Sequence, residues 1–196
     1  MRFVLASKNR HKIFEMRRIL SPLGAELFSQ EELGVDFSPE ETGDTFEENA
    51  LIKARALFEL TGVSAIADDS GLCVDALSGA PGVRSARYCE GSDRDRTARL
   101  LEVMQNVPDG ERTAQFVSVI ACVLRDKTSF CCRGECEGVI LREEKGNGGF
   151  GYDPVFYVPE HKMTFSEMPP DLKNRISHRA RALSGFLSKL KEHKLK

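Results

Sequence analysis

The strongest constraint on the fold is a pair of alternating segments separated by a short turn. Thr113–Arg125 and Ser129–Glu137 both alternate between apolar and polar positions, and Asp126-Lys127 lies between them. Because successive side chains of a strand point to opposite faces, this pattern predicts a long antiparallel hairpin. The longest apolar run within it, Phe116–Leu124, is interrupted by Ser118.

The other periodic segments predict strands and helices around this hairpin. Phe3–Ala6 reads as a short buried strand, and apolar side chains recur at helical spacing in Arg10–Leu20. Ala25–Phe28 is expected to return as a second strand, whereas Glu31–Gly43 is acidic, contains Pro39 and is expected to form an exposed loop. A strand–loop–helix opening followed by a hairpin predicts an α/β fold with a mixed sheet.

Further expected elements are a helix opened by the Thr45 and Glu48 capping box and ended by Gly62, a strand at Ala65–Ala67, a helix capped by Ser92 or Asp93 and closed by Pro108, a strand at Val155–Val158, and a last helix opened by Ser177.

Length and charge restrict the class of ligand. The 196 residues suit a single domain that spans 1–196. A formal net charge of -2 gives no broad positive field, so we expect no nucleic-acid partner. An anionic ligand must then be held by a few local Lys and Arg side chains, which favours a small phosphorylated molecule.

Cysteine spacing and apolar segments predict a cytoplasmic location. The chain has 6 cysteines, and none forms a C-x-x-C pair or partners a nearby histidine at zinc-site spacing. The first residues lack the apolar stretch of a signal peptide, and no apolar run approaches the ~20 residues that span a bilayer. We therefore expect reduced thiols, no thiolate metal site and no membrane partner.

A first polar cluster, Ser7–Lys12, lies between a predicted strand and a predicted helix. Backbone amides and the helix dipole favour an anion at this position, and Lys12 can add charge beside a phosphate. The segment lacks the spacing of a Walker loop. The alternative is a solvated loop in which Asn9 caps the helix.

A second cluster combines the acidic segment Glu40–Asp44 with Asn49 and Lys53, which lie one helical turn apart on a polar face. Carboxylates beside an ammonium suit Mg²⁺ and a substrate phosphate, because this ion prefers oxygen ligands and keeps several waters. The alternative is an acidic loop with a solvated lysine.

The third cluster, Asp68-Asp69-Ser70-Gly71, follows the apolar segment Ala65–Ala67. One carboxylate can bind metal while the other shapes its charge, and two close like charges raise the pKa of one member toward a value useful for a general base. Such residues also form ordinary turns at strand ends, and that alternative stays open.

A fourth region contains Gly146, Gly148 and Gly151 at G-x-G-x-x-G spacing. A dinucleotide-binding fingerprint must open a helix, and these glycines precede a predicted strand, so we reject a Rossmann fold. The glycine-rich loop can instead bring backbone and the rings of Phe150 and Tyr152 close to a base. A cationic group formed by Lys173, His178 and Arg179 follows, and its alternative reading is a charged helix start.

Taken together, these clusters resemble the inosine/xanthosine triphosphate pyrophosphatase family. The match runs in order from Ser7 to Arg179, and its one visible departure is Ser7, where many relatives carry threonine. The matching motifs are Ser7-x-Asn9-x-x-Lys12, Glu41-Thr42-Gly43-x-Thr45-Phe46-x-x-Asn49-Ala50-x-x-Lys53-Ala54, Ala67-Asp68-Asp69-Ser70-Gly71-Leu72, Phe150-Gly151-Tyr152-Asp153-Pro154 and Ser177-His178-Arg179.

The resemblance implies an elongated mixed sheet with helical lobes that flank a central nucleotide-binding cleft, and it implies a homodimer. Mg²⁺ is the implied cofactor, held by Glu41 and Asp69, with Asp69 as proton acceptor. The expected catalytic residues are Asp69, Asp68 and Lys53. The expected substrate-binding residues are Ser7, Lys8, Asn9, Arg10, His11, Lys12, Ser70, Phe150, Gly151, Tyr152, Asp153, Lys173, His178 and Arg179.

The implied reaction is hydrolysis of non-standard purine nucleoside triphosphates (ITP, dITP and XTP) to the monophosphate and pyrophosphate. A 6-keto purine accepts hydrogen bonds where adenine donates, so cationic donors at Lys173, His178 or Arg179 would select against ATP. Two alternatives share the same motifs, namely a non-catalytic nucleotide sensor and an enzyme for modified pyrimidine triphosphates. The joint presence of Glu41, Asp68, Asp69 and Lys53 argues against a sensor, because a sensor needs no general base.

Overall fold

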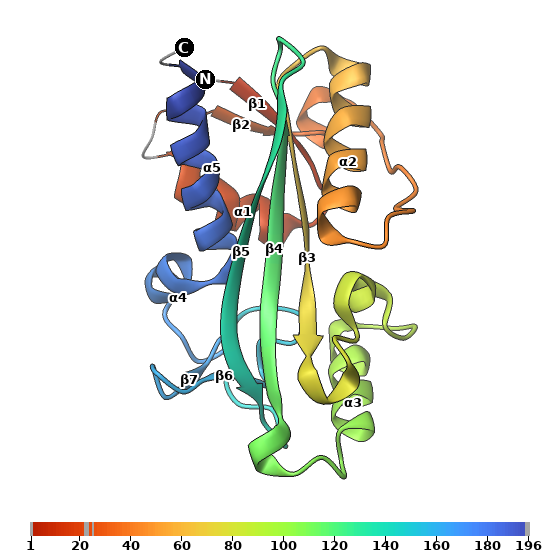
Figure 1. Cartoon of the computed structure of the whole chain (residues 1–196), viewed down its shortest axis with the longest axis vertical. Coiled ribbons are helices and arrows are strands. Elements are labelled where there is room, and N and C mark those ends of the chain that lie inside the picture. The colour runs from red at the N-terminus through yellow and green to blue at the C-terminus, as the bar shows by residue number, and fades with distance from the viewer. Residues whose placement is uncertain (1, 22–23, 25, 195–196) are drawn as a thin grey trace. The chain divides into compact units, whose positions relative to one another are not determined.

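The strands form a mixed sheet. The computed structural model describes residues 2–21, 24 and 26–194, and within these residues seven strands lie in the order β2-β1-β3-β4-β5-β6-β7 (Figure 1). β1 pairs in parallel with β2 and β3, whereas β6 pairs antiparallel with β5 and β7, which confirms the predicted mixed α/β fold. The strands are β1 Arg2–Ala6, β2 Glu26–Ser29, β3 Ala65–Val74, β4 Thr113–Val123, β5 Ser129–Ile140, β6 Phe156–Val158 and β7 Met163–Thr164.

The chain divides into two compact units. Unit 1 contains the described residues of Met1–Asp69, Ser118–Gly134 and His178–Lys196, and unit 2 contains Ser70–Val117 and Glu135–Ser177. Each unit is assembled from separate stretches of sequence, so neither corresponds to one continuous segment. The expectation of one domain over 1–196 therefore stays a prediction.

Among its described residues, unit 1 has the α-helices α1 Arg10–Leu20, α2 Phe46–Thr61 and α5 His178–Lys194. Helix α2 begins where the sequence predicts, because Thr45 accepts the Glu48 N–H while the Glu48 carboxylate accepts the Thr45 N–H. Helices α1 and α5 contact each other. Their apolar faces join β1, β3 and β4 in one core of buried side chains that includes Phe3, Leu5, Met16, Leu20, Ile66, Ile120, Leu183, Phe186 and Leu190.

Unit 2 has its own apolar core and contains α3 Asp93–Val103 and α4 Pro170–Ile176. The rings of Phe116 and Phe165 stack with centroids 5.6 Å apart, and the Phe156 ring meets Phe116 edge-on at 4.6 Å. Helix α4 was not predicted, although Pro at its first position is a common helix start. Short 3₁₀ helices complete the description at Glu31–Leu33, Asp75–Leu77, Gly82–Arg87 and Asp109–Glu111.

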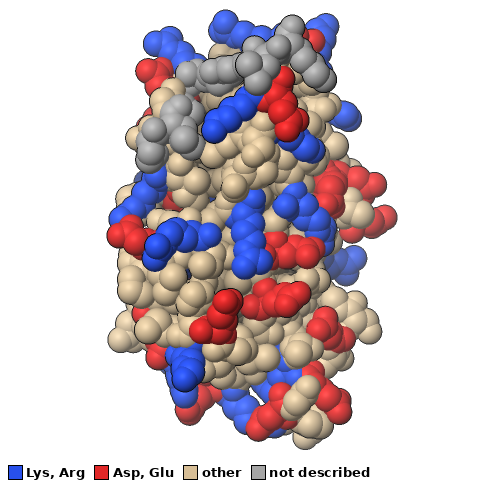
Figure 2. All heavy atoms as spheres, turned by 60° about the vertical axis from the view of Figure 1, so that its left-hand side comes forward, with Lys and Arg blue, Asp and Glu red and all other residues tan. Residues whose placement is uncertain are grey.

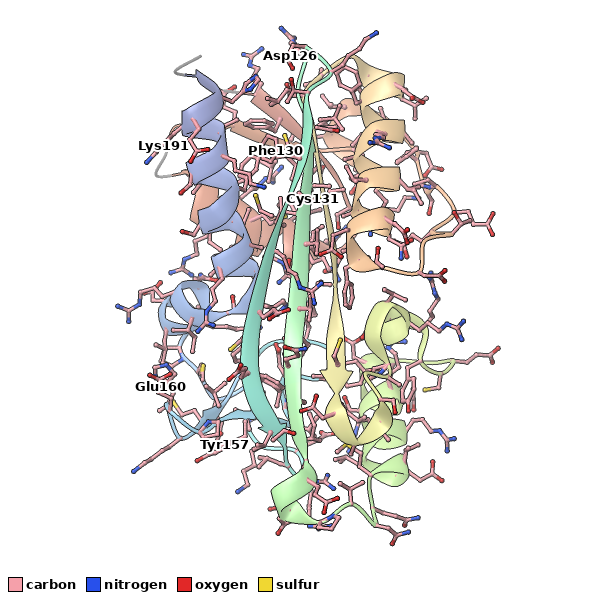
Figure 3. All side chains as sticks on the ribbon, viewed as in Figure 1. Asp126, Phe130, Cys131, Tyr157, Glu160 and Lys191 are labelled. Carbon is pink, nitrogen blue, oxygen red and sulfur yellow. The ribbon has the colours of Figure 1, made fainter. Side chains whose placement is uncertain are left out.

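The predicted hairpin is present as β4 and β5. Lys127 adopts a left-handed φ of 69°, and the Lys127 N–H donates to the Leu124 carbonyl, which closes the turn. Asp126 lies at the tip of this hairpin, and Phe130 and Cys131 follow along β5 (Figure 3). The second predicted strand is also present, although Ala25 lies outside the described residues.

One predicted strand boundary is wrong. β3 does not stop at Ala67 but continues through Asp68, Asp69, Ser70 and Gly71 to Val74. Asp and Ser favour turns because they compete for backbone hydrogen bonds, but here both Asp68 and Asp69 are buried and bound by cationic side chains. The tertiary ion pairs therefore override the local turn preference.

Charges of both signs lie at the surface of the described residues. Lys and Arg lie interspersed with Asp and Glu over the face shown in Figure 2. Among the described helices, none combines the length and the apolar character needed to cross a membrane.

Candidate active site

The centre of the candidate site is one ammonium group shared by two carboxylates. Lys53 Nζ on α2 lies 2.7 Å from Glu41 Oε1 and 2.9 Å from Asp69 Oδ1. The three side chains are only 9–24% exposed, so water screens these charges weakly. Two carboxylates against one ammonium leave the group with an excess of one negative charge, which a cation or a proton can neutralise.

The pKa values in this group follow from that arrangement. Burial raises the pKa of Asp69, and the Lys53 ammonium opposes this shift without cancelling it, partly because Glu41 adds a second negative charge nearby. Burial alone would lower the pKa of Lys53, but Asp69 and Glu41 outweigh burial and raise it. Lys53 therefore stays protonated, while Asp69 is a stronger base than an exposed aspartate.

The loop that carries Glu41 is fixed by Asn49. The Asn49 side chain is fully buried, accepts the Gly43 N–H at 2.9 Å and donates to the Gly43 carbonyl at 3.2 Å. A Cβ on Gly43 would lie 2.5 Å from Glu48 Cβ, so only glycine fits this approach. The predicted polar face of α2 is thus not solvated, because Asn49 binds the loop and Lys53 binds Glu41 and Asp69.

Asp68 points to the other face of β3 and has its own cations. Lys12 Nζ lies 2.6 Å from Asp68 Oδ2, Arg179 lies 3.5 Å from the same oxygen, and the Ser118 hydroxyl donates to Oδ1 at 2.6 Å. Burial raises the pKa of Asp68, but the charges of Lys12 and Arg179 and the hydrogen bonds outweigh it and hold the pKa well below its usual range. Asp68 therefore remains ionised and is poorly suited to accept a proton.

The Ser7–Lys12 segment contributes Lys12 to this network. Asn9 caps α1 by accepting the N–H groups of His11 and Lys12, as the alternative reading of this segment proposed. Ser7 Oγ accepts the Asn9 N–H, which shapes the loop before the helix. Lys8 pairs with Asp36 at the surface, and Arg10 and His11 are exposed. Within this segment, the structure thus brings Lys12 to the buried carboxylates.

The residues expected near the base divide between the two units. In unit 2, Lys173 Nζ lies 2.6 Å from Asp153 Oδ2 and 5.0 Å from the centre of the Phe150 ring. Tyr152 is 4% exposed and donates its hydroxyl to the Ser85 carbonyl, so its ring belongs to the core and offers no open aromatic face. Ser70 is half-buried on β3, immediately after Asp69.

In unit 1, His178 and Arg179 begin α5, and both are buried. Arg179 forms an ion pair with Glu15 of α1 in addition to its contact with Asp68. The Arg179 charge thus stabilises buried Asp68 and half-buried Glu15 in its own unit.

Two members of this network, Glu15 and Ser118, were not predicted from the sequence. Ser118 left a visible signal, because it is the polar interruption in an apolar run and its hydroxyl binds Asp68. Glu15 left none, since an acidic residue on a helix is usually solvated.

The donor set suits a hard divalent cation. Asp69 Oδ2 is buried and has no hydrogen-bond partner among the described residues, which leaves a carboxylate oxygen available to a cation. Glu41 lies beside it across Lys53. No group of three or more His, Cys, Asp or Glu side chains arranged for a metal occurs in the part of the chain that the structure describes. Mg²⁺ accepts such a sparse set, because it keeps several waters and binds substrate phosphates as well.

Comparison with known proteins decides the family. Residues 3–189 match the model described as the Ham1 family. The chain belongs to the Ham1 family. A relative from Haemophilus ducreyi, named dITP/XTP pyrophosphatase, is 51% identical over 193 residues, which cover 96% of this chain and 98% of that protein.

Solved Ham1 structures share the fold as well. A HAM1 protein from Coxiella burnetii aligns with a TM-score of 0.88 and 44% identity, covering 98% of this chain and 99% of the other. The Ham1 protein of Staphylococcus aureus gives a TM-score of 0.88 at 38% identity, covering 98% of this chain and 100% of the other. The Ham1 fold therefore extends over nearly the whole chain.

The ionised, buried Asp68 predicts a pH dependence of stability for this Ham1 chain. Its folded pKa lies below the unfolded value of about 3.9, so its contribution is complete above that pH and is lost as the pH falls toward the folded pKa. In this acid range the unfolded state binds a proton that the folded state does not. Urea titrations between pH 5 and pH 3 should show a steeper loss of unfolding free energy in the wild type than in Asp68→Asn.

Ser118→Ala tests the same network with the charge retained, and it should lower the unfolding free energy at pH 7 by roughly 1.5–3 kcal/mol, as for a lost hydrogen bond to a charged group. Asp36→Asn, an exposed carboxylate paired with Lys8, is the matched control and should change the acid slope much less. Equal slopes for the wild type and Asp68→Asn, with no destabilisation in Ser118→Ala, would contradict the account of Asp68.

Proposed function

We propose that the chain is a nucleoside triphosphate pyrophosphatase that converts ITP, dITP and XTP to the monophosphate and pyrophosphate. The observation that carries the proposal is the weakly exposed group in which Lys53 binds both Glu41 and Asp69. The name of the Haemophilus ducreyi relative, dITP/XTP pyrophosphatase, supports the same substrate class. In this proposal the enzyme removes non-standard purine nucleotides from the nucleotide pool.

Glu41 and Asp69 would hold Mg²⁺, since both offer carboxylate oxygens and Asp69 Oδ2 has no hydrogen-bond partner among the described residues. The chemistry that a bound Mg²⁺ supplies is neutralisation of charge on the phosphates and the leaving pyrophosphate.

Asp69 accepts a proton from the attacking water. The Lys53 ammonium holds Asp69 Oδ1 at 2.9 Å and so fixes the orientation of the carboxylate that takes the proton. The water oxygen forms the new bond to phosphorus, the bond between the α- and β-phosphates breaks, and pyrophosphate leaves with the electron pair of the broken bond.

The phosphates are held by cationic side chains of unit 1. Lys12 lies at the start of α1, where the helix dipole also favours an anion, and Lys53 lies on α2. Asp68 keeps Lys12 oriented through their 2.6 Å ion pair, so we assign Asp68 an indirect role in phosphate binding. Ser7, Lys8, Asn9, Arg10 and His11 complete the proposed phosphate loop.

The base is recognised through its 6-keto group. Lys173, His178 and Arg179 are the proposed donors, with Phe150, Gly151, Asp153 and Ser70 around the nucleotide, while Tyr152 supports this loop from the core through its hydrogen bond to the Ser85 carbonyl. A mismatch between a donor and the 6-amino group of adenine costs roughly 1–3 kcal/mol, so two mismatches give a preference on the order of 10² to 10⁴. We further propose that the enzyme acts in the cytoplasm and forms a homodimer. Size-exclusion chromatography with light scattering measures the mass of the assembly and so tests the homodimer.

Substrate choice tests this proposal first. With Mg²⁺ present, ITP, dITP and XTP should each be hydrolysed with a kcat/KM at least about 100 times that for ATP, by the two-mismatch estimate. The measurement is pyrophosphate release from a panel that also contains modified pyrimidine triphosphates. Similar kcat/KM values for ATP and ITP would contradict the proposed selectivity, and preferential cleavage of a pyrimidine would favour the alternative enzyme class.

Lys53→Ala tests the shared ammonium. Its removal takes away a charge-assisted contact to phosphate that strengthens as charge moves onto the leaving group, so kcat should fall and KM should rise. A loss of about 10-fold or more in kcat/KM is expected for a contact worth ~1.5–3 kcal/mol. Arg55→Ala, an exposed cation on the same helix, is the matched control and should retain wild-type kinetics on ITP. Unchanged kcat and KM in Lys53→Ala would remove this residue from the site.

A further inference from the structure

The loop that carries Phe150 and Asp153 is attached to helix α3 through Gly151. The Gly151 N–H donates to Asp93 Oδ2 at 2.8 Å, and the Gly151 carbonyl lies 3.3 Å from the Thr97 hydroxyl. Gly151 has a left-handed φ of 59°, which favours glycine at this position. Both polar backbone groups of one residue are therefore bound by side chains one helical turn apart on α3.

The first turn of α3 holds Asp93 in a defined orientation. Ser92 and Asp95 form a capping box that fixes the helix start, and Arg96 donates to Asp93 Oδ1 at 2.6 Å. Thr97 is 1% exposed, and its hydroxyl also lies 3.0 Å from the Asp93 carbonyl. Asp93 is thus bound by Arg96 through one oxygen and by Gly151 through the other.

The position of Gly151 affects Phe150, Asp153 and Lys173, which are proposed to recognise the base. The neighbouring Phe150 N–H donates to Asp153 Oδ2, and the same oxygen accepts from Lys173 Nζ. The Lys173 ammonium also lies 5.0 Å from the centre of the Phe150 ring. A displacement of Gly151 therefore shifts Phe150 and disturbs the contacts of the Lys173 ammonium with Asp153 and with the Phe150 ring.

We propose that Asp93, assisted by Thr97, is a positioning residue for purine recognition. It touches no part of the nucleotide but fixes the loop whose residues do, and the inference rests on the proposed function of Phe150, Asp153 and Lys173. This loop recognises the base and takes no part in proton transfer. Replacement of Asp93 should therefore weaken nucleotide binding and leave kcat nearly unchanged.

The test compares Asp93→Ala and Asp93→Asn with the wild type in steady-state kinetics on ITP and in calorimetric binding of inosine monophosphate. Asp93→Ala should raise KM about 5- to 10-fold, as for one lost hydrogen bond, and should weaken monophosphate binding similarly while kcat stays within about twofold. Asn at this position still accepts the Gly151 N–H, so Asp93→Asn should restore KM to within about twofold. Thr97→Val should give a smaller increase in KM, because the Thr97 contact is longer.

Asp95→Ala is the matched control. It removes the other carboxylate of the same helical turn and lowers stability through the lost capping box, but it leaves the Gly151 contact in place. Its KM and monophosphate affinity should match the wild type even though its melting temperature falls. Unchanged KM and affinity in Asp93→Ala, or an equal effect in Asp95→Ala, would overturn the inference.

Failure of the proposed function gives a different result. A wild-type protein that hydrolyses none of the triphosphates contradicts the proposed function, whatever the Asp93 variants do. The monophosphate affinities then still decide the inference, since weaker binding in Asp93→Ala supports it and absence of binding by the wild type overturns it.

Discussion

The structure of unit 1 depends on the burial of two adjacent aspartates in the middle of β3. A buried carboxylate is strongly unfavourable unless cations and hydrogen bonds compensate for lost water. Asp68 and Asp69 point to opposite faces of the strand, so each needs its own partners. On one face, Lys12 from α1 and Arg179 from α5 provide the positive charge beside Asp68. On the other face, Lys53 from α2 provides the positive charge beside Asp69.

This constraint separates the roles of two neighbouring residues. Asp68 has two cations and a hydroxyl against it and stays ionised, whereas Asp69 shares its single ammonium with Glu41 and has a raised pKa. Two of the cations that compensate Asp68 and Asp69, namely Lys12 and Lys53, are those proposed to bind phosphates. Folding of unit 1 and assembly of the proposed phosphate site therefore use the same ion pairs.

Local patterns in the sequence predicted the elements that local forces determine. The capping box at Thr45 and the helical period of Arg10–Leu20 gave α2 and α1 at their observed bounds. The end of β3 was predicted wrongly, because Lys12, Lys53 and Arg179 lie far from Asp68 and Asp69 along the chain and no local pattern reveals their ion pairs. For the same reason Glu15 was missed. The order of motifs identified the candidate site residues, but only the structure shows that Tyr152 lies in the core and that Asn49 fixes the Gly43 loop.

The kcat of Asp69→Asn on ITP tests the central claim most directly. Asparagine is nearly isosteric with aspartate but does not accept the water proton, so kcat should fall by about 100-fold or more. Circular dichroism and thermal melting should show a folded protein, so that the loss is assigned to chemistry. A folded Asp69→Asn that keeps more than about a tenth of the wild-type kcat would contradict the role of Asp69 as proton acceptor, since loss of a general base usually costs at least ~10²-fold.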